Sequence, residues 1–167
     1  RLHPSRLKDS RYNTREKALR ACLELNPVQV EAVIDLAQYH YFRNQADKSV
    51  ELYRGYLEIV PGSVTVLMAL GQVYVSRNDF NGIVRVYKKI LEIEPGNADA
   101  YYNLGLVYYN NEQITRAVEF FRQAVELNNH ANSHLYLGLI NQIRGDTSGA
   151  VIHLRERLRL RKGKDDP

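Results

Sequence analysis

Cysteine, tryptophan and long apolar runs are scarce in this sequence, and each scarcity excludes a class of protein. Of the 167 residues, one is cysteine and none is tryptophan. A single cysteine excludes an intramolecular disulfide framework and a thiolate metal cluster. No apolar run approaches the roughly 20 residues that a helix needs to cross a bilayer. The ten glycines and five prolines fall at intervals, so they act as punctuation between ordered segments.

Charge is distributed unevenly along the chain, although the net charge is only +4. Residues 1–20 carry seven Lys/Arg and two Asp/Glu, and residues 155–167 carry six and three. The body between them, residues 21–154, carries ten and fourteen. Basic ends on a mildly acidic body argue against treating the whole chain as a nucleic-acid binder.

The strongest feature of the sequence is an internal repeat. Three prolines stand 34 residues apart, and a leucine followed by glycine or alanine recurs at spacings of 34, 34 and 33. Repeats of this length are typical of solenoids in which each unit is a pair of helices. The markers are Pro27, Pro61 and Pro95, with Leu36-Ala37, Leu70-Gly71, Leu104-Gly105 and Leu137-Gly138.

Within each cycle apolar side chains recur at steps of three and four residues, which predicts helices and not strands. In the third cycle we expect Gly105 where two helices approach most closely, with Ala117 opposite and Phe121 filling the remaining space. Prolines are expected to end second helices. The predicted helices lie near residues 14–25, 30–43, 46–59, 64–77, 80–93, 98–111, 114–127, 131–144 and 147–160.

These motifs resemble those of the tetratricopeptide repeat proteins, whose repeat has the same length, the same Leu-Gly pair and an aromatic residue in its second helix. The resemblance covers roughly residues 14–160. The third cycle carries most of the family's positions, namely Tyr101, Leu104, Gly105, Tyr108, Ala117, Phe121 and Ala124.

The resemblance implies an all-α fold, a right-handed superhelical solenoid of antiparallel helix pairs with about four full repeats after one leading helix. The implied domains are a basic N-terminal segment at 1–13, expected to be extended, a repeat domain at 14–160 and a tail at 161–167. The repeats are expected near 30–63, 64–97, 98–130 and 131–163.

Candidates for chemistry are few, and we expect neither an enzyme nor a bound cofactor. His130 and His134 are four residues apart, a spacing that can bind a metal on a helix. Because no suitably spaced cysteine or carboxylate accompanies them, we expect no metal site. Cys22 lies on an apolar helical stripe and is expected to be a buried structural thiol. His40 is expected to be a core histidine with satisfied hydrogen bonds.

In the family, the first helix of each repeat lines a concave face, and the residues that project there in this sequence are unusually apolar and aromatic. Exposed apolar surface usually marks a binding site. The alternative is that the strip is inner packing, for which Leu106 and Leu139 are the strongest candidates. The predicted groove residues are Ile34, Gln38, Tyr41, Phe42, Met68, Gln72, Val75, Tyr102, Asn103, Leu106, Tyr109, Leu135, Tyr136 and Leu139.

Two functional hypotheses follow. The first is a scaffold or adaptor that holds a protein or peptide partner with an apolar segment in this groove. Some family members hold a terminal carboxylate with a Lys/Asn/Arg clamp, but of the corresponding positions only Asn103 fits, so we do not expect that clamp. The second is self-assembly into homo-oligomers, through the end of the fourth repeat or through insertion of residues 1–13 into a neighbour's groove.

The compartment stays open. One cysteine fits a reducing compartment as well as an export compartment where cysteine is avoided. Because the first residue is Arg1 and not Met, a signal peptide or anchor removed earlier is compatible with the sequence. The cytoplasm is slightly favoured over the periplasm.

A basic tail closes the sequence, with six Lys/Arg between residues 155 and 164. The lesser alternative function is association with nucleic acid through this tail. No aromatics interleave for base stacking, and Leu158 and Leu160 fall on different sides of a helix, so we expect neither nucleic acid nor a membrane as its partner. The main expectation is a solvated terminal helix whose cations favour its C-terminal end.

Overall fold

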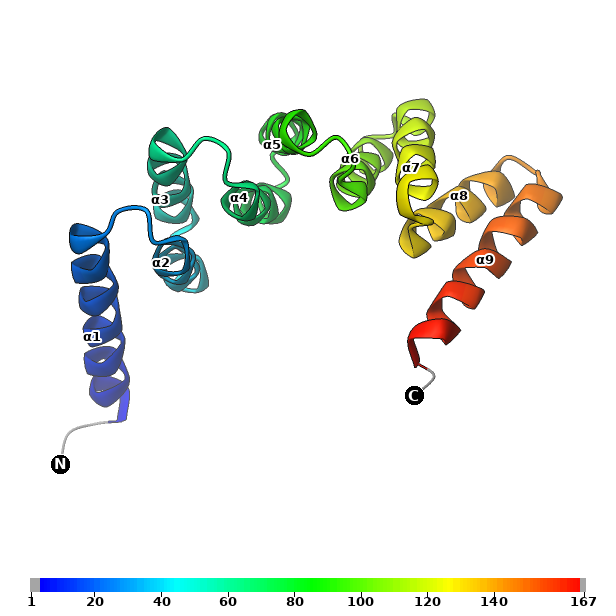
Figure 1. Cartoon of the computed structure of the whole chain (residues 1–167). Coiled ribbons are helices and arrows are strands. Elements are labelled where there is room, and N and C mark those ends of the chain that lie inside the picture. Colours follow the sequence, from blue (N-terminus) through cyan, green and yellow to red (C-terminus); the bar gives the residue numbers. More distant parts are fainter. Residues whose placement is uncertain (1–3, 166–167) are drawn as a thin grey trace. The chain divides into compact units, whose positions relative to one another are not determined.

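The computed structural model describes residues 4–165, which form nine α-helices joined by short turns (Figure 1). Side chains are described for residues 14–161. Within the described residues, no helix combines the length and the apolar composition that crossing a bilayer requires. The helices are α1 (Pro4–Leu25), α2 (Val30–Phe42), α3 (Ala46–Ile59), α4 (Val64–Ser76), α5 (Phe80–Ile93), α6 (Ala98–Asn110), α7 (Ile114–Asn128), α8 (Ala131–Ile143) and α9 (Thr147–Asp165).

The all-α fold and the helix positions predicted from the repeat are confirmed. All internal helix ends fall within one residue of the predicted ones. Two predictions at the chain ends are wrong. Helix α1 begins at Pro4, so residues 4–13 are helical and not extended, and α9 continues to Asp165 through the predicted tail. Proline is well tolerated in the first turn of a helix, and neither glycine nor another proline interrupts residues 5–13.

The turn inside each helix pair contains one residue with left-handed backbone geometry. Asn44, Asn78 and Glu112 have φ values of 60°, 53° and 59°, and Gly145 has 79°. These positions repeat at the spacing of the sequence repeat. At Asn44, Glu112 and Gly145 the turn reverses the chain so that the next helix packs back along the previous one. Asparagine and glycine adopt this backbone conformation most readily.

The chain divides into two compact units, residues 1–79 and residues 80–167. In the first unit, α2 packs against α1, α3 and α4. Its core contains Leu36, Tyr53 and Val66, each at most 2% exposed. His40 is also 2% exposed, and its Nδ1 lies 2.8 Å from Oε1 of Gln45, so the prediction of a satisfied core histidine is confirmed.

Cys22 is half-buried, so the prediction of a buried thiol is wrong. Its helix α1 packs on α2 and on no other described helix of this unit, which leaves part of the apolar stripe uncovered. Leu25, on the same stripe, is 89% exposed. The Cys22 thiol donates a hydrogen bond to Oε1 of Gln29 over 3.1 Å.

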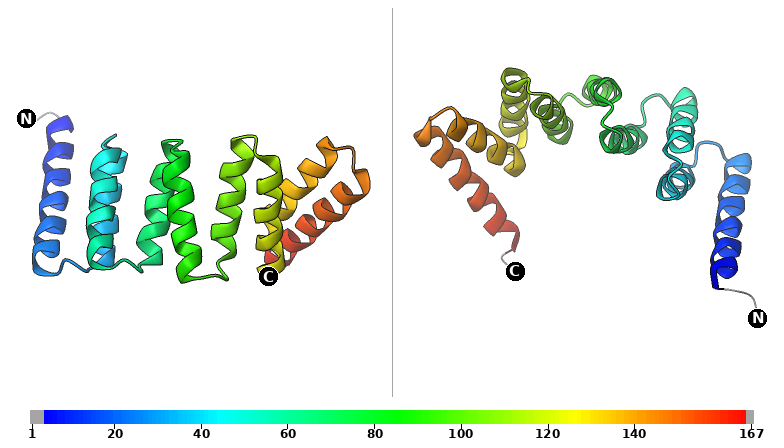
Figure 2. Two further views of the ribbon diagram at one scale, coloured as in Figure 1. Left: turned by 90° about the horizontal axis from the view of Figure 1, so that it is seen from above. Right: turned by 180° about the vertical axis from the view of Figure 1, so that it is seen from behind.

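The second unit contains α5 to α9, with two antiparallel hairpins, α6–α7 and α8–α9 (Figure 2). Phe121 of α7 is fully buried, as are Leu104 of α6 and Ala117. The Phe121 ring lies directly over Gly105, as the sequence predicts. In the second hairpin Gly138 of α8 faces the Leu154 side chain of α9 in the same way.

Candidate functional site

In the first unit, the predicted groove residues come from two helices, and none of them is buried. Phe42 is 82% exposed and Val75 is 52% exposed. Helix α2 supplies Ile34, Gln38, Tyr41 and Phe42, and α4 supplies Met68, Gln72 and Val75. Two of them, Gln38 and Phe42, also line a cavity of about 450 Å³ between α1 and α2, together with Arg15, Asp35, Tyr39 and Arg43.

In the second unit, the predicted groove residues come from α6 and α8, and all are partly exposed. Leu106 and Leu139, the strongest candidates for core packing, are not buried. Their side chains are partly exposed, so inner packing stays a prediction for both beside the binding role. Helix α6 supplies Tyr102, Asn103, Leu106 and Tyr109, and α8 supplies Leu135, Tyr136 and Leu139.

Three tyrosines form the centre of this face, which we call the tyrosine face (Tyr102, Tyr109 and Tyr136). The ring centroid of Tyr136 lies 6.2 Å from that of Tyr102 and 5.3 Å from that of Tyr109. Tyr136 also stacks on Phe121, with centroids 5.1 Å apart and planes 13° from parallel. Because Phe121 is fully buried, the tyrosine face rests on the core and its rings are held in place.

The surroundings of Tyr102 raise the pKa of its hydroxyl. Burial raises its pKa most, the neighbouring Tyr136 raises it further, and the positive charge of Arg157 opposes both. On the other side, the Tyr102 ring lies against the His130 ring, with centroids 4.6 Å apart. The tyrosine face thus continues into the N-terminal end of α8. A neutral hydroxyl can donate and accept hydrogen bonds at its edge.

His130 and His134 do not converge on a common point. The Nε2 atom of His130 lies 3.1 Å from Asp99, and its Nδ1 accepts a hydrogen bond from the Ser133 backbone N–H. His134 points toward α9 and meets His153 instead. Within the described residues, no group of three or more His, Cys, Asp or Glu side chains is arranged to hold a metal ion.

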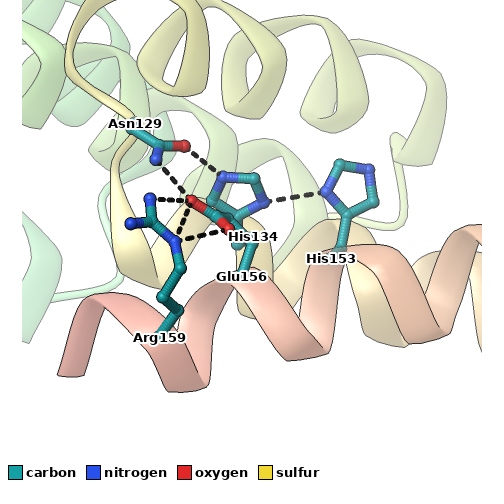
Figure 3. Close-up of polar contacts among 5 residues, drawn as sticks. All are labelled: Asn129, His134, His153, Glu156 and Arg159. Carbon is teal, nitrogen blue, oxygen red and sulfur yellow. Dashed lines mark hydrogen bonds and ion pairs between the residues drawn. The ribbon is translucent and has the colours of Figure 1, made fainter. Parts of the chain in front are cut away.

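A polar network between α8 and α9 centres on His134, which is 5% exposed (Figure 3). Its Nε2 lies 2.6 Å from Oδ1 of Asn129 and its Nδ1 lies 2.9 Å from Nδ1 of His153. Because the amide oxygen can only accept, His134 donates through Nε2 and accepts through Nδ1, and His153 donates. Asn129 in turn donates to Glu156 over 2.7 Å, and Arg159 pairs with the same carboxylate.

The pKa values of His134, His153 and Glu156 are all lowered in this network. Burial, then His153, lower the pKa of His134, and burial, then Arg122, lower that of His153. Hydrogen bonds from Arg159 and Asn129 lower the pKa of Glu156 to about 2. The lowered pKa values favour the neutral form of both histidines, and the shared hydrogen bond requires it of the acceptor, His134. Sequence reasoning missed this pair, because no motif links residues of two helices that are 19 positions apart.

Comparison with known families decides the class of protein. A model described as tetratricopeptide repeat matches residues 98–130, and a second, described as TPR repeat, matches residues 71–112. The chain contains tetratricopeptide repeats. Domains of this kind typically mediate protein–protein interactions and are usually non-catalytic. No curated protein matches the sequence.

Solved structures of MamA proteins share the tetratricopeptide repeat fold of this chain. One crystal structure of MamA superposes with a TM-score of 0.78 at 17% identity, covering 99% of this chain and 98% of that one. MamA from Desulfovibrio magneticus RS-1, from residue 41 to its end, gives 0.75 at 20% identity, covering 96% and 91%. MamA AMB-1 gives 0.69 at 23% identity, covering 95% and 87%. These superpositions show a common fold.

Proposed function

We propose that this tetratricopeptide repeat protein is a non-catalytic scaffold that holds an apolar segment of a partner protein within a multiprotein complex. The observation that carries the proposal is the tyrosine face: three aromatic side chains from α6 and α8 contact one another and none is buried. Tyrosine offers apolar contact area and a hydroxyl at little cost in conformational freedom. An amphipathic helix or an extended apolar peptide suits such a surface.

The first unit supports the same proposal with its own exposed apolar side chains. Phe42 and Val75 are more than half exposed, and Met68 is partly exposed. Isolated apolar residues on a surface are ordinary, but exposed apolar residues on corresponding helices of two repeats favour a binding role. We propose that the first helices of the repeats, as predicted from the sequence, line the partner-binding surface in each unit.

The test compares partner binding by the wild type and by the double variant Tyr102→Ala with Tyr109→Ala. Peptides for the titration are selected from a displayed library of random peptides on the full chain. We expect the double variant to lose at least about tenfold in affinity, because each aromatic anchor contributes more than about 1 kcal/mol at an interface. Circular dichroism melting reports whether the variant still folds.

Tyr101→Ala is the matched control, since Tyr101 lies on the same helix with similar exposure but packs toward Phe120 of α7. It is expected to bind as the wild type does. Unchanged binding by a folded Tyr102/Tyr109 double variant would remove the tyrosine face from the proposal.

Self-assembly is the second candidate, favoured by apolar side chains at the α8–α9 end of the second unit. Ile143, Ile152 and Leu158 are 78%, 66% and 56% exposed. The ends of repeat solenoids associate when no polar cap covers them. Light scattering that gives the monomer mass up to high protein concentration would eliminate this candidate.

A further inference from the structure

A polar cavity of about 540 Å³ lies where α7, α8 and α9 meet, beside the tyrosine face. Two arginines of α9 line one wall, and the N-terminal end of α8 lines the other. We call it the arginine cavity. Its lining residues are Asp99, Asn128, Asn129, His130, Ala131, Asn132, Arg157, Leu160 and Arg161. The sequence predicts a solvated basic helix here, and Arg157 departs from that prediction because it is only partly exposed.

Both arginines of the cavity lack a carboxylate partner. Neither Arg157 nor Arg161 takes part in an ion pair with any residue that the structure describes. The Nε atom of Arg157 is buried and has no hydrogen-bond partner in the described part of the chain. By contrast, Arg159 on the same helix is paired with Glu156. A buried donor that stays unpaired is costly, which is the usual sign of a missing acceptor.

The other charged groups that line the cavity are compatible with a bound anion. The one carboxylate among the lining residues, Asp99, lies 3.1 Å from Nε2 of His130 and is thereby engaged. The first turn of α8 adds the partial positive charge of a helix N-terminus. Guanidinium groups bind carboxylates through paired hydrogen bonds, which gives both strength and orientation.

We propose that the arginine cavity binds an acidic side chain of the same partner peptide whose apolar part lies on the tyrosine face; this inference rests on the proposed function. His130 joins the two surfaces, since it lines the cavity and its ring lies 4.6 Å from that of Tyr102. The partner is therefore a peptide with Asp or Glu next to an aromatic or aliphatic segment. The site differs from a clamp on the first helices, because its cations come from α9.

The experiment uses the full chain and the peptides selected from the displayed library. The tightest peptide is synthesised with its acidic residue and with the corresponding amide, Asn or Gln. Each is titrated against wild type and against Arg157→Gln with Arg161→Gln. We expect the arginine substitutions and the peptide amide each to weaken binding at least about tenfold, and the two losses together to be far from additive. The matched control is Arg144→Gln with Arg155→Gln, which removes the same charge from exposed positions outside the cavity.

The outcomes separate the two proposals. Peptides that bind through Tyr102 and Tyr109 without any acidic preference, or that weaken equally in both arginine double variants, overturn the arginine cavity and leave the tyrosine face standing. Failure to select any peptide overturns both. Inorganic phosphate that displaces the peptide at low concentration, with no effect of the peptide amide, assigns the cavity to phosphate and also overturns the proposal.

Discussion

Gly105 lies so close to Phe121 that a Cβ atom at position 105 would stand 2.5 Å from two carbons of its ring. Real Cβ contacts do not come so near, and Phe121 is fully buried, so the ring has no free space into which to move. This contact fixes the separation of α6 and α7. Tyr136 stacks on the same ring, so the contact also sets the base of the tyrosine face.

Gly105→Ala is therefore expected to destabilise the protein by about 1–3 kcal/mol, as overpacking does in other cores. Gly138→Ala should cost less, because the facing Leu154 side chain is flexible and only half-buried. Gly55→Ala is the control, since nothing lies within 4 Å of its Cβ position. Urea unfolding measures all three. Equal stability of the Gly105 and Gly55 variants would contradict this packing.

Helix capping separates two positions that look alike in sequence. Asn97 is the N-cap residue of α6, and its Oδ1 accepts a hydrogen bond from the Ala100 backbone N–H over 2.9 Å. Ser63 is the N-cap residue of α4, but its side chain makes no capping hydrogen bond. Asn97→Ala should cost about 1 kcal/mol of unfolding free energy, and Ser63→Ala less than about 0.5 kcal/mol. Thermal melts of the two variants give the comparison, and a larger loss for Ser63→Ala would count against it.

Glu112 occupies the left-handed turn position where the other cycles have asparagine or glycine. Its backbone φ of 59° disfavours a side chain of this kind. We expect Glu112→Asn to raise the unfolding free energy by about 0.5–1 kcal/mol. Glu112→Ala removes the same charge without easing the backbone and should bring no gain. Chemical denaturation decides between them, and an equal gain from both variants would point to charge as the cause.

Acidification is expected to weaken the α8–α9 hairpin through His134 and His153. Both have folded-state pKa values below the usual 6.5, so the unfolded chain takes up protons first as the pH falls. Below that value the unfolded state binds more protons, and the free energy of unfolding falls with pH until the folded-state values are reached. Urea unfolding between about pH 7.5 and about pH 5 measures the slope.

Several charged or titratable groups surround His134 and His153, and they determine which control variant is needed. His130, Glu156 and Arg159 act on His134, and Arg122 and Asp146 act on His153. Replacing His134 and His153 with Gln should flatten the slope, whereas His130→Asn should leave most of it. If the unfolding free energy of the double Gln variant still falls with pH at the same slope, other titrating groups cause the pH dependence.

The helix positions of this chain could be predicted from its sequence, whereas most polar contacts between its helices could not. The spacing of Leu104-Gly105 and its counterparts predicted the helix pairs and the Gly105–Phe121 contact, because close packing of two helices leaves a periodic mark on small and large residues. The cluster at His134 and the arginine cavity leave no such mark. Each brings together side chains from several helices. The partner of each side chain depends on how the backbone of the neighbouring turns orients that side chain.

The chain ends were the other weak point. The periodic pattern fades before residue 14, so the sequence did not reveal that α1 begins at Pro4. Cys22 shows the same limit, since a stripe of apolar residues predicts burial only where a second element covers it. The predicted groove residues fall on surfaces that are not buried, but whether they bind a partner is beyond any pattern of residues.

The most direct test of the account is a backbone NMR titration of the full chain with the tightest selected peptide. The tyrosine face predicts the largest amide shifts in α6 and α8, residues 98–110 and 131–143, with further shifts around Arg157. The solvent-exposed sides of α5 and α7 should stay unchanged. Shifts confined to those outer helices, with α6 and α8 unaffected at saturation, would contradict the proposal that this surface holds the partner.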